Sequence, residues 1–445
     1  MIFFSFTKKK FAVEVFVNFV SNTMLGASGI LQNILIGNYY QADGLGVFSW
    51  SLAVYMICSV ISTFGIQVSV VKFVAEYKEN TESLSEIISS ALWLVLFCSI
   101  SITLILLLLL PVCLNKQLIR QETLPVFRNI LISLPFFSLN KVLMGILNGL
   151  RRMYMLAFAQ SMRAILLISF SMYLIAMDQS LDIVILAFFF TEIVLSLWLF
   201  VFSSLSSHVF SSVAVIPNSF WLKKHLFFGG KSAFTTSVGE LNKNIDMLIL
   251  GYFSTNYHVG IYGLASTVAK GLFMISSAIQ MSFNPIISYT YSKYGTEQLV
   301  VYIYKIYKFT FLTSIATSVI AVIGYPILIS LFVRDVSFHI SIPVYYILLC
   351  GVIPMTIFCF SGAVLVMCGY ATEQFQLMVI VLLFNIFCNI LLVPTIDVYG
   401  AAVSTTLSYI VLVVLLNYFV QKKLRINLFK IFIESILYAK QKNRI

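Results

Sequence analysis

Long apolar runs, separated by short polar segments, follow one another along the whole chain of 445 residues. Residues 101–110, for example, read Ser-Ile-Thr-Leu-Ile-Leu-Leu-Leu-Leu-Leu. A helix needs about 20 predominantly apolar residues to cross the hydrocarbon core of a bilayer, and runs of this kind predict about twelve spans. The predicted spans are residues 11–36, 46–71, 87–114, 124–148, 156–177, 181–203, 226–251, 260–285, 306–333, 341–367, 373–394 and 398–420.

Composition supports the membrane class. Hydrophobic residues make up 60% of the chain and charged residues 10%, whereas soluble domains contain about 45–50% apolar and about 25% charged residues. Soluble domains of this total length could not bury so much apolar surface. We therefore predict an all-α integral membrane protein whose short connections leave no room for an extramembrane domain.

The formal net charge of +11 requires a separate explanation. Nucleic-acid binding is excluded, because the Lys and Arg residues form short clusters between apolar runs and no basic domain could follow a phosphate backbone. The clusters instead follow the rule that cytosolic loops carry an excess of Lys and Arg. If the N-terminus is cytosolic, the opposite side carries only Lys116, Arg120, Arg128 and Arg334. Both termini are therefore expected in the cytosol.

The last segment, residues 421–445, differs from the spans. Apolar residues recur there near helical spacing among Lys and Arg, at Ile426, Phe429, Ile433, Leu437 and Tyr438. This pattern is typical of a basic amphipathic helix that lies on an anionic membrane surface.

The two halves of the chain repeat one another. At an offset of 214 residues, Gly37 aligns with Gly251, Gly46 with Gly260 and Phe48 with Tyr262. Each half contains an even number of predicted spans, so both halves insert the same way round. We predict two pseudo-symmetric six-helix bundles, residues 1–205 and 206–420, with a site between them.

At this point the sequence resembles a known family, the polysaccharide and O-antigen flippases of the multidrug/oligosaccharidyl-lipid/polysaccharide exporter superfamily. The segments that carry the resemblance span almost the full chain: Asn33–Gly37, Gly44–Phe48, Val71–Glu76, Asp246–Gly251, Val259–Tyr262 and Tyr399–Tyr409. The resemblance implies a V-shaped cavity between the bundles and alternating access. It also implies an undecaprenyl pyrophosphate-linked oligosaccharide as cargo, a bacterial inner membrane and polysaccharide polymerase machinery as a partner.

The chain departs from this family in one respect. The lipid flippases that this sequence resembles include ones with several arginines in their first two helices. The first two predicted helices here carry only Glu14 and the terminal Lys72.

Charges inside predicted spans indicate function or pairing, because each costs a few kcal/mol at least in a bilayer. The span at residues 226–251 carries the densest set on one helical face: Ser232, Thr236, Glu240, Lys243 and Asp246. Through the repeat, this face overlies Asn18 and Asn22 of the first span. We predict that the four uncharged residues Asn18, Asn22, Ser232 and Thr236 form a polar stripe facing a cavity.

Cations in the spans are the predicted substrate-binding groups, because Lys and Arg bind phosphate. They are Lys270, Lys243, Arg163 and Lys141. Lys270 lies in the middle of its span and has no acidic residue within one turn of sequence. Lys243 is three residues from both Glu240 and Asp246, so either these acids couple transport to an ion or they neutralise Lys243. Arg163 and Lys141 could also extend toward the interface.

Motifs for covalent chemistry are missing from the sequence. The seven cysteines lie in or beside apolar runs without a C-x-x-C pair, and the four histidines have no ligand spacing. Nucleotide-binding, zinc-protease and serine-hydrolase motifs are also missing. We therefore expect no metal, no cofactor and no enzymatic activity.

Three functions remain for comparison. The first is a flippase for a lipid-linked oligosaccharide. The second is a multidrug or cation antiporter of the same superfamily, whose cavity should be dominated by acids. The third is a membrane glycan polymerase or ligase, which is disfavoured because the longest predicted outer loop, residues 115–124, is too short for a catalytic loop.

Overall fold

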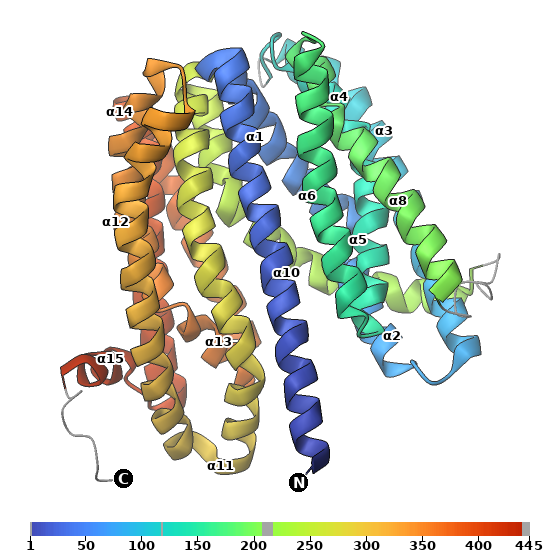
Figure 1. The fold of residues 1–445 in the computed structure, drawn as a ribbon, viewed down its shortest axis with the longest axis vertical. Helices are drawn as coiled ribbons and strands as arrows, with labels where there is room; N and C mark the ends of the chain where they lie inside the picture. The colour runs from blue at the N-terminus through green and yellow to red at the C-terminus, as the bar shows by residue number, and fades with distance from the viewer. Residues whose placement is uncertain (1, 117–118, 207–216, 438–445) are drawn as a thin grey trace. The chain divides into compact units, whose positions relative to one another are not determined.

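The computed structural model describes residues 2–116, 119–206 and 217–437, without the side chains of residues 2–16, 18, 203–206, 278, 281–282, 285, 309 and 435–437. The described part is helical and contains no strand, which confirms the predicted all-α class (Figure 1). The chain separates into two compact units, Met1–Tyr252 and Phe253–Ile445. The division into bundles at residue 205 stays a prediction.

The first unit is built from nine helices within its described residues. They are α1 (Ile2–Thr63), α2 (Ile66–Glu76), α3 (Thr81–Asn115), α4 (Leu124–Leu131), α5 (Leu134–Gly149), α6 (Met153–Ala176), α7 (Leu181–Val184), α8 (Ala187–Ser206) and α10 (Ser219–Phe253). The second unit has α11 (Asn256–Phe332), the 3-10 helix η1 (Val336–Ile340), α12 (Ser341–Ile357), α13 (Phe360–Met367), α14 (Ala371–Leu424) and α15 (Leu428–Leu437).

Three predicted loops are kinks of one or two residues within long helices. Non-helical backbone interrupts α1 at Gln41, α11 at Gly295 and α14 at Ile396 and Asp397. Each kink falls between two predicted spans. Eight helices of the described chain are long and apolar enough to cross a membrane, or nine if the bent pair α4–α5 is one span. The number of twelve spans stays a prediction.

Helix α1 packs against α6, which it follows in the same direction (Figure 1). Ser21 Oγ donates to Gln160 Oε1 at 2.8 Å, and Gln32 Nε2 donates to Ser171 Oγ at 3.0 Å. Both pairs are 139 residues apart in sequence, so the helices are parallel. The Ser21 hydroxyl and the Gln32 Nε2 thus bond to α6 and not to lipid, where unsatisfied groups cost several kcal/mol.

Helix α5 approaches α2 closely through two glycines spaced by four residues. A Cβ atom at Gly145 would lie 3.0 Å from the backbone oxygen of Gln67, and one at Gly149 would lie 2.9 Å from the Val74 side chain. Small residues at this spacing let membrane helices pack backbone against side chain. The contact places this face of α5 directly beside α2.

The turn between α1 and α2 fits tightly against α10. Gly65 has φ of 67°, and a Cβ there would lie 2.2 Å from the Gly229 carbonyl oxygen. Deeper in the same region, the buried His225 ring lies 2.7 Å from Ser69 Oγ and 3.2 Å from the Ile87 carbonyl oxygen. These contacts fix the start of α10 to α2 and α3.

A similar turn occurs once in each of the two units. Asp178 and Asp397 have left-handed backbone, with φ of 56° and 52°. Asp178 accepts a hydrogen bond from Tyr39, and Asp397 accepts one from Ser254. The donors and the aspartates occupy corresponding places in the two halves, which supports the pseudo-symmetric repeat.

The basic tail is helical from Leu428 to Leu437, and it is not simply a surface helix. Leu428 and Ile431 are buried, and Phe432 packs on a core that includes Phe358, whereas Phe429 and Ile433 are 39% and 52% exposed. The apolar residues are therefore divided between the protein core and the exposed surface. Residues 438–445 of the predicted tail lie outside the described residues.

Candidate functional site

Two predicted cations of the first unit share one aromatic ring. Lys141 of α5 has its Nζ 4.6 Å from the centre of the Phe137 ring, and the guanidinium carbon of Arg163 from α6 is 4.8 Å from the same centre. Lys141 Nζ also donates to Ser59 Oγ at 3.0 Å. Attraction to the ring face offsets part of the cost of placing two positive charges close together.

Arg163 is held by an acid on α8. Its Nη2 lies 2.7 Å from Glu192 Oε2, and the Arg163 and Glu192 side chains are 12% and 3% exposed. Asn140 Nδ2 donates to the same carboxylate oxygen at 2.8 Å, and Ser196 Oγ donates to Asn140 Oδ1 at 2.9 Å. Arg163 thus belongs to a buried hydrogen-bonded ion pair, which favours the structural alternative over a purely substrate-binding role.

The predicted polar face of α10 is partly satisfied by its own helix. Ser232 donates to the Phe228 carbonyl and Thr236 donates to the Ser232 carbonyl. Asp246 is 1% exposed and accepts a bond from the backbone N–H of Met247 at 2.9 Å. The Ser232 and Thr236 side chains on this face are half-buried.

Glu240 and Lys243 form the pair that their spacing predicts. Lys243 Nζ lies 3.2 Å from Glu240 Oε2, and the Lys243 side chain is 66% exposed. The charges of Glu240 and Lys243 also act electrostatically on Lys141. The structure therefore gathers Lys141, Arg163, Lys243 and Glu240 in one region of the first unit.

The remaining predicted site residues are Lys270, Asn22 and Asn18. Lys270 is half-buried on α11, in the second unit, and Asn22 is half-buried on α1. The side chains of Asn18 and Glu14 lie outside the described residues. The binding or coupling role of every predicted site residue stays a prediction.

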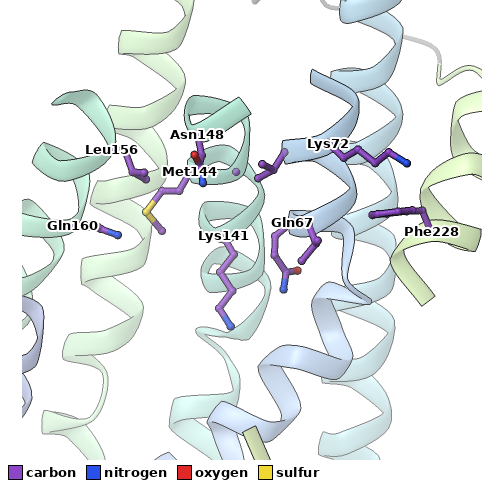
Figure 2. Close-up of a pocket in the computed structure, with 11 residues that line it drawn as sticks. Gln67, Lys72, Lys141, Met144, Asn148, Leu156, Gln160 and Phe228 are labelled. Carbon is purple, nitrogen blue, oxygen red and sulfur yellow. The ribbon is translucent and has the colours of Figure 1, made fainter. Parts of the chain in front are cut away.

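A cavity of about 540 Å³ lies in the first unit, between α2, α5, α6 and α10 (Figure 2). Its polar lining residues are Gln67, Lys72, Lys141, Asn148 and Gln160, and its apolar ones are Val68, Val71, Met144, Gly145, Leu156 and Phe228. Small-molecule sites occupy about 300–1,000 Å³. The cavity is therefore within the size range of a small-molecule site.

The polar groups of the cavity are basic or neutral. Figure 2 shows the Lys141 and Gln67 side chains with their polar ends directed the same way. Lys72 Nζ lies 4.4 Å from the Phe228 ring centre. Among the lining residues, all in the described part of the chain, none is Asp or Glu. Such a cavity attracts anions and neutral polar groups and disfavours cations.

Four of these polar lining residues were not predicted from the sequence as site residues: Gln67, Lys72, Asn148 and Gln160. All four lie within or at the ends of predicted spans or just beside them. Lys141 and Asn148 are seven residues apart, two turns of the same helix face, and this spacing was the signal that could have found Asn148. Groups of three metal-ligating residues are not found among the described residues.

The helical architecture has the fold of solved transporters of the MOP superfamily. The chain belongs to the polysaccharide biosynthesis protein family, whose model matches residues 11–291. The MatE family model matches residues 232–391. These matches confirm the resemblance that the sequence segments indicated. Among curated proteins, none matches the chain.

Solved structures share the fold at low sequence identity. An inward-facing multidrug resistance MATE family transporter of the MOP superfamily has a TM-score of 0.77 at 15% identity, over 92% of this chain and 96% of its own. The lipid II flippase MurJ, in an inward closed conformation, has a TM-score of 0.72 at 15% identity, over 96% and 93%. A MOP superfamily transporter from Pyrococcus furiosus with a binding pocket of reverse polarity has a TM-score of 0.64 at 15% identity, over 93% and 94%.

Proposed function

We propose that this protein is a flippase that moves an undecaprenyl pyrophosphate-linked oligosaccharide from the cytosolic to the outer leaflet by alternating access. The product would supply the synthesis of O-antigen, capsule or another surface polysaccharide. The observation that carries the proposal is the cavity of the first unit, which is lined by two lysines, three amides and no acid. Family membership agrees with this role, and the fold is shared with a lipid II flippase.

The chemistry of the cargo fits such a lining. A pyrophosphate is anionic and accepts hydrogen bonds, so the Lys141 ammonium is a suitable partner, since Lys binds phosphate as a point charge. The sugars need polar surroundings, which the three amides supply. An inside-negative membrane potential also drives an anionic headgroup outward, by about 2.3 kcal/mol per charge per 100 mV.

The runner-up is a multidrug or cation antiporter. The MatE model match and the structural similarity to a multidrug transporter favour it. A cationic cargo, however, needs a counter-charge, which carboxylates would supply. The basic lining of the cavity opposes such a cargo, and Glu240 is already paired with Lys243.

The cellular setting belongs to the same proposal. We place the protein in a bacterial cytoplasmic membrane with both termini in the cytosol, and a polysaccharide polymerase would use its product in the outer leaflet. The excess of Lys and Arg on one side of the predicted spans supports this orientation.

Deletion of the gene tests the proposal. Without the protein, lipid-linked saccharides should accumulate in the inner leaflet and surface polysaccharide should be lost, as mass spectrometry of extracted lipids and surface staining would show. A plasmid copy should restore both, and a Lys141→Met copy should not. Unchanged glycolipids and surface polysaccharide, together with an altered tolerance of cationic drugs, would establish the antiporter instead.

A further inference from the structure

We propose that Gln67 recognises the sugar next to the pyrophosphate, so that the cavity accepts a phosphate-linked saccharide bearing a hydroxyl or acetamido N–H donor. This inference rests on the proposed flippase function and specifies its substrate class. It begins from the Gln67 side chain, which lines the same cavity as Lys141, from α2 (Figure 2).

The Gln67 amide lacks a partner for its acceptor. Its Oε1 atom is buried, and within the described residues no donor lies within hydrogen-bonding reach. Buried polar atoms are normally hydrogen-bonded, so an exception calls for an explanation. The terminal torsion of Gln is broad and roughly two-fold, and a half-turn exchanges the amide oxygen and nitrogen, so that the oxygen faces the cavity and the nitrogen takes the buried place. A ligand that donates a hydrogen bond would then satisfy it.

Gln67 Oε1 needs a hydrogen-bond donor, and this requirement distinguishes a sugar from a phosphate as its partner. An ionised pyrophosphate only accepts hydrogen bonds, so it can satisfy the ammonium of Lys141 and not the Oε1 of Gln67. Sugar hydroxyls and acetamido N–H groups do donate. Lys141 and Gln67 point the same way in Figure 2, so one headgroup can present its phosphate to the first and its adjoining sugar to the second.

Neighbouring groups narrow the sugar further. Asn148 lies on the same cavity wall as Lys141, and its side chain is exposed there, so it offers both a donor and an acceptor. No lining residue of the described chain is acidic, so a free ammonium group on the sugar would lack a counter-charge. The class recognised is therefore a neutral hydroxylated or N-acetylated sugar.

The test compares two measurements on Gln67→Met, which keeps the side-chain length and removes the amide. In the deletion strain, surface polysaccharide export should fall about tenfold or more, as expected when a hydrogen bond to substrate is lost. Undecaprenyl pyrophosphate, which has no sugar, should bind the purified full-length variant in lipid nanodiscs as it binds the unmodified protein. Membrane abundance should not fall, because the substitution removes a buried atom that has no partner.

Matched variants separate the alternatives. Gln121→Met, at an exposed turn, should change neither export nor binding, whereas Lys141→Met should weaken undecaprenyl pyrophosphate binding. Normal export by Gln67→Met would overturn the inference. So would a parallel loss of undecaprenyl pyrophosphate affinity, which would assign Gln67 to the anion, or a fall in abundance, which would assign it to the fold. Failure of the flippase proposal itself is distinct, since deletion would then leave export intact.

Discussion

Replacement of Glu192 by alanine should destabilise the first unit strongly. The Glu192 carboxylate is 3% exposed and pairs with Arg163 at 2.7 Å. Its removal leaves the Arg163 guanidinium buried with an uncompensated charge, which typically costs about 3–5 kcal/mol. Asn140 keeps its second bond, to the Glu192 backbone carbonyl at 2.8 Å. The loss of its bond to the Glu192 carboxylate therefore adds little.

Thermal unfolding of the purified protein in detergent, followed by tryptophan fluorescence, measures this effect. For a unit of this size, about 3–5 kcal/mol corresponds to a fall in Tm of roughly 6–20 °C. Glu79→Ala is a suitable control, because Glu79 is exposed and surface substitutions usually change stability by less than about 0.5 kcal/mol. Arg163→Met combined with Glu192→Leu should recover most of the loss, since the buried charges are removed together.

Two results would refute this reasoning. If Glu192→Ala lowers Tm no more than Glu79→Ala does, the ion pair does not stabilise the unit. If the double variant is as unstable as the single one, the loss comes from packing and hydrogen bonding and not from the unpaired charge.

Three further predictions concern other regions. Lys270→Ala should reduce surface glycan export at normal protein abundance and Lys270→Glu should reduce it more, because a negative charge repels phosphate; normal export by Lys270→Ala would remove Lys270 from the site. Gly65→Ala should lower Tm by several degrees, because its Cβ would lie 2.2 Å from a carbonyl oxygen and its φ is 67°; an unchanged Tm would show that the turn relaxes freely. In a cysteine-free background, an impermeant thiol reagent should label single cysteines from outside the cell at Asp43, Asp178 and Asp397, and labelling only after lysis would reverse the proposed orientation.

The fold class could be predicted because surfaces that face lipid must be apolar, which raises the hydrophobic fraction of the sequence. Long apolar runs admit few alternatives to helices, since every backbone group must be hydrogen-bonded within the bilayer. The ends of the helices were harder to predict. Gln41 shows that one residue with a positive φ is enough to join two helices, and few sequence signals mark such a residue.

The candidate site was predictable only in part. The ion pair of Glu240 and Lys243 could be predicted from the sequence because both residues lie on one helix, three positions apart. The pairing of Arg163 with Glu192 was not, because the two lie on different helices and helix packing brings them together. Gln67 lies near the end of a predicted span, where an amide suits the membrane interface equally well, so only the cavity distinguishes it.

The parallel packing of α1 on α6 has a consequence for biosynthesis. Gln32 acquires its partner Ser171 only after 139 further residues have been made. At translation rates of about 5–20 residues per second, this takes roughly 7–28 s. During that interval, Gln32 cannot form its bond to α6. The nascent chain must therefore be sheltered by water or by the insertion machinery until α6 is synthesised.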